Sequence, residues 1–113
     1  MKTSSCKAKG RRAAQETKDM LLKYAPDLKP DDILVTSSGV TGEDLVLSPA
    51  AQEIMPYTFE CKNVEKLNVW DGLKQAASHA LKKPQAIPLL VFRRNRSDLY
   101  VALKLEDFLK LTR

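Results

Sequence analysis

The sequence predicts an α/β fold in which helices flank a central mixed β-sheet. Stretches with apolar residues at helical spacing alternate with short runs rich in β-branched residues, in the order α-β-β-β-α-β-β-α. The run over 87–92 is the most apolar of these and is short, as expected for a strand buried on both faces. At 113 residues the chain is long enough for one such core. We therefore expect a single domain over 9–113, preceded by a flexible basic tail over 1–8.

The N-terminal half is expected to begin with a helix over 9–24, which Pro26 ends. Strands over 32–36 and 44–47 are separated by small residues and are predicted to form a hairpin-like pair. A third strand, over 57–62, alternates in polarity and carries aromatic residues. The buried face of the helix is predicted from residues that recur at helical spacing: Ala13, Thr17, Met20, Leu21 and Tyr24.

The C-terminal half is expected to begin with a helix over 68–82, with Asn68 as its N-cap. The strand over 87–92 and another over 99–103 would flank an arginine-rich turn, and a short helix over 105–111 would close the chain. The predicted apolar stripe of the first helix contains Trp70, Leu73, Ala77, Ala80 and Leu81, and its polar face contains Lys74, Gln75, Ser78, His79 and Lys82. Trp70 and Tyr57 are interpreted as core residues.

Positive charge indicates a polyanionic partner. The net charge is +5 and the sequence pI is about 9.3, and basic side chains gain affinity by displacing counterions from phosphates. Basic residues precede the first acid, Glu16, and recur near residue 94, whereas acids concentrate over 27–60. A basic rim around an acidic centre would suit a nuclease. The alternative is that many small proteins are basic by chance.

Several classes of protein are excluded by their missing signals. The two cysteines, Cys6 and Cys61, form no CxxC pair and have no histidines at zinc-ligand spacing. There is no Walker A motif, so no nucleotide cofactor is expected. No run has transmembrane length, and the charged N-terminus lacks the apolar segment of a signal peptide. We expect an intracellular, cytoplasmic protein, in a bacterium or from a virus in its host cell, with no membrane partner.

The candidate site combines Asp44 with Glu60 and Lys62. Side chains at i and i+2 of a strand point to one face, so Glu60 and Lys62 project together and Cys61 points away. Two carboxylates supply hard oxygen ligands for Mg²⁺, and the Cys61 carbonyl could add another. Lys62 could activate water or stabilise the phosphate in phosphodiester hydrolysis. The alternative is an ordinary surface salt bridge, because an acid and a lysine at this spacing often occur by chance.

These residues stand in a pattern that resembles the PD-(D/E)XK nuclease superfamily. The resemblance lies in a first helix, the segment GEDLVL over 42–47, the segment FECK over 59–62 and the helix that follows. Glu43 stands where the family name has proline. The N-terminal half is similar to archaeal-type Holliday junction resolvases and their viral counterparts, in Lys9-Gly10-Arg11-Arg12, in Glu16 on the helix and in the strand that ends in Ser37-Ser38-Gly39. The resemblance implies a restriction-endonuclease-like core.

The resemblance adds two further site residues. It implies that Glu16 acts as a catalytic residue and metal ligand, although it could instead pair with Arg12 or Lys23. Gln75 is a catalytic candidate near the scissile phosphate, or a solvent-facing polar residue. His79, the single histidine, is interpreted as structural or exposed. The expected DNA contacts are Lys7, Lys9, Arg11, Arg12, Ser37, Ser38, Arg93, Arg94 and Arg96, of which the three turn arginines would repel one another without a bridging anion.

The expected function is hydrolysis of branched DNA, with Holliday junctions as the first candidate substrate. The enzyme would be a Mg²⁺-dependent endodeoxyribonuclease in which Mn²⁺ can substitute. A homodimer is expected, because a four-way junction offers two symmetric scissile phosphates. Part of the interface could come from the apolar C-terminal residues Leu103, Leu105, Phe108, Leu109 and Leu111. The alternatives are another repair, restriction-like or exonucleolytic enzyme of this superfamily and a non-catalytic DNA-binding module.

Overall fold

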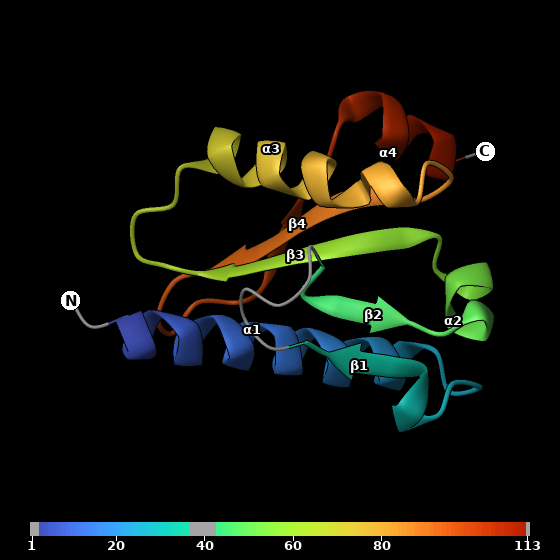
Figure 1. The fold of residues 1–113 in the computed structure, drawn as a ribbon, viewed down its shortest axis with the longest axis horizontal. Coiled ribbons are helices and arrows are strands. Elements are labelled where there is room, and N and C mark those ends of the chain that lie inside the picture. Colours follow the sequence, from blue (N-terminus) through green and yellow to red (C-terminus); the bar gives the residue numbers. More distant parts are fainter. Residues whose placement is uncertain (1–2, 37–42, 113) are drawn as a thin grey trace.

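Helices enclose a central sheet in the computed structural model, which describes residues 3–36 and 43–112, with side chains from residue 9 onward (Figure 1). Along the chain the elements are α1 (Thr3–Tyr24), the 3₁₀ helix η1 (Pro30–Asp32), β1 (Ile33–Val35), β2 (Leu45–Leu47), α2 (Pro49–Ile54), β3 (Tyr57–Asn63), α3 (Val69–His79), the 3₁₀ helix η2 (Ala80–Lys82), β4 (Ile87–Arg93), β5 (Tyr100–Ala102) and α4 (Leu105–Leu111).

The five strands form one mixed sheet in the order β1-β2-β3-β4-β5. The pairs β1–β2, β2–β3 and β4–β5 are antiparallel, and β3 and β4 are parallel along their full length, with Glu60 opposite Leu90 and Asn63 opposite Arg93. The parallel pair requires a crossover connection, which α3 provides. The predicted α/β class with a mixed sheet is confirmed, and so is the predicted hairpin-like pairing of the first two strands.

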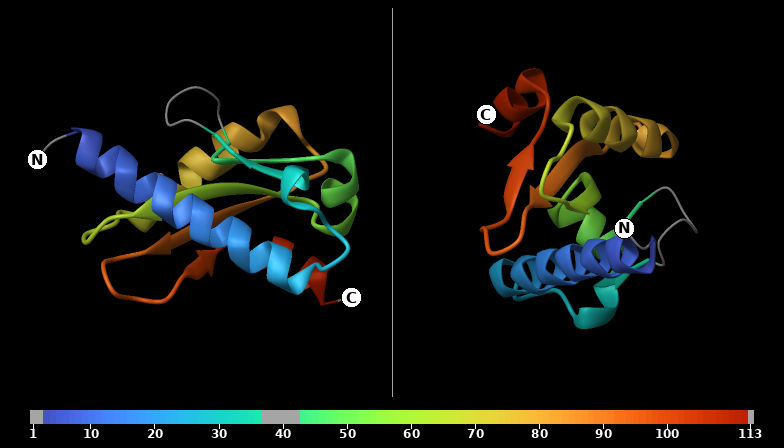
Figure 2. Two further views of the ribbon diagram at one scale, coloured as in Figure 1. Left: turned by 90° about the horizontal axis from the view of Figure 1, so that it is seen from below. Right: turned by 90° about the vertical axis from the view of Figure 1, so that its left-hand side faces the viewer.

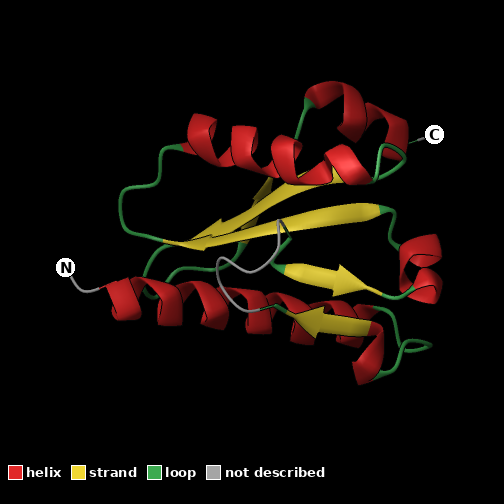
Figure 3. Cartoon of the chain, in the orientation of Figure 1, coloured by secondary structure: helices red, strands yellow, loops and turns green. Residues whose placement is uncertain are grey.

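The helices lie on both faces of the sheet, as the end-on view shows (Figure 2) and the colouring by secondary structure makes plain (Figure 3). Helix α1 covers one face and contacts mainly β3, whereas α3 covers the other face across β3 and β4. Helix α4 lies on the α3 side (Figures 1 and 2). Leu89, Leu90 and Val91 are consecutive and all buried, which confirms that β4 is buried on both faces.

Helix α1 differs from its prediction in length and in its buried face. It begins at Thr3, so residues 3–8, predicted as a flexible tail, continue the helix. Their stretch contains no proline or glycine to break a helix that is already nucleated. Met20 and Tyr24 were predicted to be buried but are 50% and 79% exposed. The buried face is instead built from small residues, mainly Ala13, Ala14 and Thr17, which allow the helix axis to approach the sheet closely.

Helix α3 also packs through small residues, and its predicted apolar stripe is largely wrong. Trp70 and Leu81 are 81% and 79% exposed, so Trp70 is not a core residue. Ala77 is exposed as well. The buried residues are Gly72 and Ala76 of α3, followed by Ala80 of η2. An added Cβ at Gly72 would lie 2.8 Å from Leu90 Cδ2, which shows how closely the helix backbone approaches β4.

Two short elements, η1 and α2, were not predicted. Helix α2 follows Ser48, whose hydroxyl accepts a hydrogen bond from Ala51 N at 3.1 Å as an N-cap, with Pro49 as the first helical residue. The same hydroxyl donates to Asp32 Oδ1 at 2.6 Å, which lowers the pKa of that carboxyl. The prediction of α3 capped by Asn68 is confirmed. Within the described residues, none of the helices is long and apolar enough to cross a membrane.

Candidate active site

Asp44 lies where β2 and β3 begin to separate. Leu45 and Phe59 are the paired residues of these two strands. Asp44 immediately precedes Leu45. Its N–H donates to Phe59 O at 3.1 Å, and its Oδ2 accepts a 2.6 Å hydrogen bond from Cys61 N. The carboxylate thus takes the position that a backbone carbonyl of β2 would have in a continued ladder. This places its charge directly beside the middle of β3.

Glu60 and Lys62 lie on one face of β3, as the strand pattern predicted. Glu60 Oε2 and Lys62 Nζ are 3.4 Å apart. Glu60 is 5% exposed, so its carboxylate is held inside the protein rather than on its surface. Cys61, between them, points to the opposite face, where its Sγ lies 3.9 Å from Thr17 Oγ1 of α1. The structure therefore brings Asp44, Glu60 and Lys62 together at one place on the sheet.

His79 also reaches this site, which the sequence interpretation did not anticipate. Its Nδ1 is 2.7 Å from Glu60 Oε1. The signal that could have indicated this is spacing, because His79 follows the buried residues Gly72 and Ala76 by seven and three positions, on the helix face that meets the sheet. The prediction placed the large apolar residues on the face that meets the sheet, and it therefore assigned His79 to the opposite, polar face.

Burial and neighbouring charges shift the pKa values of Asp44 and Cys61 at the site. Burial raises the pKa of Asp44, and the negative charge of Glu60 raises it further, against the stabilising hydrogen bond from Cys61 N and the positive charge of Lys62. Burial, with the charge of Asp44, also raises the pKa of the Cys61 thiol to about 12. Burial is thus the main reason that the ionised forms of Asp44 and Cys61 are disfavoured.

A second ion pair links the segment before β2 to the segment that follows α3 and η2. Lys83 Nζ lies 3.2 Å from Glu43 Oε1 and 3.2 Å from Glu43 Oε2. Glu43 directly precedes Asp44, and Lys83 directly follows η2. The pair links the two segments that carry Asp44 and His79, so it ties both sides of the site to each other.

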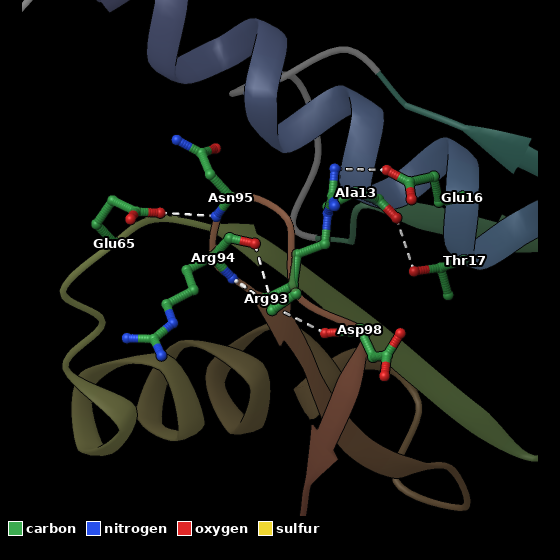
Figure 4. A network of polar contacts seen from close by, with 9 residues as sticks. Ala13, Glu16, Thr17, Glu65, Arg93, Arg94, Asn95 and Asp98 are labelled. Carbon is green, nitrogen blue, oxygen red and sulfur yellow. Dashed lines mark hydrogen bonds and ion pairs between the residues drawn. The ribbon is translucent and has the colours of Figure 1, made fainter.

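Glu16 is not brought together with the other predicted site residues. Its Oε1 lies 2.7 Å from Arg93 Nη2, and Figure 4 shows the two side chains pointing towards one another from α1 and β4. Arg93 is opposite Asn63 in the parallel register, on the face that Cys61 shares. Glu16 therefore contacts the α1 face of the sheet, whereas Glu60 and Lys62 occupy the α3 face. The predicted alternative partners, Arg12 and Lys23, are replaced by Arg93.

Gln75 and the residues predicted to contact DNA are spread over several parts of the structure. Gln75 is exposed on α3, and Arg11 and Arg12 are exposed on α1. Arg94 and Arg96 are exposed in the β4–β5 turn, where Asn95 N donates to Glu65 Oε2 at 2.7 Å (Figure 4). Arg93 is the last residue of β4 and has a protein carboxylate as its partner, so it does not share the exposed turn. Lys9 is half-buried, and the Lys7 side chain, Ser37 and Ser38 lie outside the described residues.

Asp44 and Glu60 are the side chains that could hold a metal ion. In the described part of the chain, no group of three or more His, Cys, Asp or Glu side chains could do so. Zinc sites are built mainly on histidine and cysteine ligands, with carboxylates as additional ligands, so two carboxylates alone are not a typical zinc site. It does fit Mg²⁺, which binds through one or two carboxylates and keeps its other positions for water and phosphate.

Comparisons with known proteins add no relative: no family model matches the chain, and no curated protein or solved structure matches it. The function must therefore be inferred from the geometry of the site.

Proposed function

We propose that the protein is a Mg²⁺-dependent endonuclease that cuts branched DNA, with Holliday junctions as its first candidate substrate. One observation carries the proposal. Three charged groups meet where β2 and β3 separate. They are the buried carboxylate of Glu60, the ammonium of Lys62 3.4 Å from it, and the carboxylate of Asp44, which accepts a hydrogen bond from the neighbouring Cys61 N–H. Acids and a lysine at such a position can bind a cation and a phosphate together.

The order of elements supports a restriction-endonuclease-like core. Helix α1 precedes the antiparallel strands β1, β2 and β3, and α3 then leads to β4, parallel to β3. The resemblance to the PD-(D/E)XK superfamily implies this order. It also implies that the two acids and the lysine come from the region of β2 and β3, and here Asp44 directly precedes β2 while Glu60 and Lys62 lie on β3. We assign the chain to this fold as part of the proposal.

Asp44 and Glu60 would hold Mg²⁺, with the Cys61 carbonyl as a further ligand. The N–H and C=O of a strand residue point to the same side, and Cys61 N points to Asp44. Burial is the main cause of the raised pKa of Asp44 and the charge of Glu60 adds to it, so a cation there would stabilise the ionised form of both carboxylates. When bound, Mg²⁺ supplies Lewis-acid chemistry, because it acidifies water and neutralises charge on phosphate.

Each side chain then has a defined task. Asp44 is oriented by the Cys61 N–H, so its carboxylate is positioned before substrate arrives. Lys62 is 31% exposed at its side chain, so its ammonium can contact both Glu60 and a phosphate oxygen. There it would offset the charge that develops during hydrolysis and orient the attacking water.

Exposed basic groups would bind the DNA backbone. Arg11 and Arg12 extend from α1, and Arg94 and Arg96 from the β4–β5 turn. Contacts of this kind read phosphate positions rather than base sequence, as a structure-specific enzyme requires. A homodimer would place two sites on the two symmetric strands of a junction. The exposed apolar residues of α4, Leu105, Phe108, Leu109 and Leu111, are available for its interface.

Cleavage of matched DNA substrates tests the proposal. Purified protein would be incubated with labelled four-way junction, linear duplex and single strand, with Mg²⁺ or with EDTA. We expect paired nicks in the junction that require Mg²⁺, and a loss of at least about a hundredfold in rate for Lys62→Ala. Because Glu60 keeps its His79 partner, Lys62→Ala should remain folded.

Lys74→Ala is the matched control, since it removes an exposed lysine from α3. Its cleavage rate should equal that of the wild type. Cutting of linear DNA at the same rate would point to a repair or restriction-like nuclease instead. Binding without cleavage would indicate a non-catalytic DNA-binding module. Undiminished cleavage by Lys62→Ala would disprove the proposed site.

A further inference from the structure

The carboxylate of Glu60 is held from two sides by different residues. Oε1 is 2.7 Å from His79 Nδ1, and Oε2 is 3.4 Å from Lys62 Nζ. The His79 contact is the shorter one, and His79 is on α3 rather than on the strand that carries Glu60. The orientation of a strand carboxylate is thus set by a helix on the same face of the sheet.

The packing of α3 places His79 within reach of Glu60. Gly72 brings the helix backbone so close to Leu90 that a Cβ would overlap its side chain. Ala76 and Ala80 continue this buried, small-residue face. His79 lies beside them at the last position of α3 and is the residue of this face with a long polar side chain. Its ring is therefore directed at the sheet, and Glu60 is the acid that it meets.

We propose that His79 is a positioning residue that sets the orientation of Glu60 for metal binding. This inference rests on the proposed function. An ionised carboxylate only accepts hydrogen bonds, so Nδ1 must carry the proton in this pair. A neutral imidazole with its proton on Nδ1 and an imidazolium both satisfy that requirement. Held at Oε1 by His79 and at Oε2 by Lys62, the carboxylate cannot rotate towards either partner alone.

The count of acceptor sites explains why this arrangement favours a cation. A carboxylate offers about four lone-pair directions. His79 uses one of them on Oε1, and Lys62 forms an ion pair with Oε2. The remaining directions stay available to a ligand beside Asp44. Without His79, the 5% exposed carboxylate would lose its short hydrogen bond and turn both oxygens towards Lys62. Outer residues that orient metal ligands in this way affect metal affinity strongly.

Mn²⁺ binding to matched variants tests the proposal without relying on activity. The loss of the electron paramagnetic resonance signal of free Mn²⁺ measures binding to wild type, His79→Leu, His79→Asn and Ser78→Leu. We expect His79→Leu to bind Mn²⁺ about ten- to a hundredfold more weakly. His79→Asn should stay within a few-fold of wild type, because its amide can donate from nearly the same position as Nδ1. Ser78→Leu, at an exposed neighbouring residue, should match wild type.

The tautomer of His79 gives a test that needs no variant. Since the chain has a single histidine, long-range ¹H–¹⁵N spectra report this ring alone. We expect the proton on Nδ1 in metal-free protein, whereas free neutral histidine prefers Nε2. An Nε2–H ring with a bare Nδ1 would overturn the proposal, even if His79→Leu failed to fold.

The outcomes separate this inference from the proposed function. If Mn²⁺ binding and junction cleavage depend on Asp44 but His79→Leu binds Mn²⁺ like wild type, the positioning role is overturned and the nuclease stands. Equal weakening in His79→Leu and His79→Asn would also overturn it, since packing rather than hydrogen-bond donation would then matter. If wild type binds no Mn²⁺ and cuts no DNA, both proposals fail together.

Discussion

The Oδ2 atom of Asp44 accepts a 2.6 Å hydrogen bond from the backbone N–H of Cys61. The bond takes the place of a backbone contact between β2 and β3, because Asp44 precedes Leu45 and Cys61 follows Phe59, beyond the last paired residues of the two strands. It also places Asp44 beside the residue that separates Glu60 from Lys62. A carboxylate fixed by a backbone group loses little further entropy when it binds a ligand.

Removal of the Asp44 charge should stabilise the metal-free protein at neutral pH. Burial and the charge of Glu60 raise the folded-state pKa of Asp44 above its usual 3.8. A group with a raised pKa contributes stability below its unfolded-state pKa and loses it as the pH rises through the folded-state pKa. Asp44→Asn should therefore gain stability over wild type above pH 3.8 and hold that gain at neutral pH.

Urea unfolding in EDTA from about pH 3 to about pH 8 measures this difference. Asp27→Asn, at an exposed loop position, is the control and should show no such gain. Added Mg²⁺ should stabilise wild type but not Asp44→Asn, because the variant lacks one proposed ligand. A variant less stable than wild type at neutral pH would show that the buried charge is not costly.

Glu16→Gln should retain cleavage within a few-fold of wild type. Its carboxylate is paired with Arg93 on the α1 face, away from Glu60 and Lys62. Loss of the pair should lower the free energy of unfolding by about 1 kcal/mol or less, because Glu16 is 46% exposed at its side chain. Junction cleavage and urea unfolding would be compared with Glu53→Gln, an exposed position on α2. If folded Glu16→Gln lost as much cleavage activity as Lys62→Ala, Glu16 would have to separate from Arg93 and take part in the reaction.

The two glycines in the helices should respond to alanine in opposite directions. At Gly72 the new Cβ would lie 2.8 Å from the fully buried Leu90, so Gly72→Ala should destabilise the protein by about 1 to 3 kcal/mol. A Cβ added at Gly10 would have no neighbouring atom within 4 Å, so Gly10→Ala should stabilise the protein by up to about 1 kcal/mol. Thermal unfolding of both variants checks the pair. Equal effects would contradict the close approach of α3 to β4.

Cys61 should be unreactive in the folded protein. Its pKa of about 12 leaves roughly one thiol in 10⁴ ionised at pH 8, and the side chain is buried. In a Cys6→Ser background Cys61 is the remaining thiol, so Ellman's reagent reports it alone. Labelling should be slow in buffer and fast in urea. Fast labelling in buffer, with the fold intact, would show that α1 does not cover Cys61 as the structure has it.

The sequence by itself determined the type and order of the main elements, because those depend on local spacing. Alternation over 57–62 predicted a strand with Glu60 and Lys62 on one face, and both lie there. The branched run over 87–92 predicted a doubly buried strand, which β4 is. Asn68 marked the start of α3 through its side-chain cap. Each of these features requires only neighbouring residues.

The tertiary structure decided which face of each helix meets the sheet. Both helices pack through small residues, because alanines in α1 and Gly72 in α3 allow a backbone approach that large side chains would prevent. That approach leaves Trp70 in solvent and turns His79 onto Glu60. It also pairs Glu16 with Arg93, across a separation in sequence that no local pattern encodes. Hydrophobicity favours large residues inside, but the distance between backbones selected the small ones.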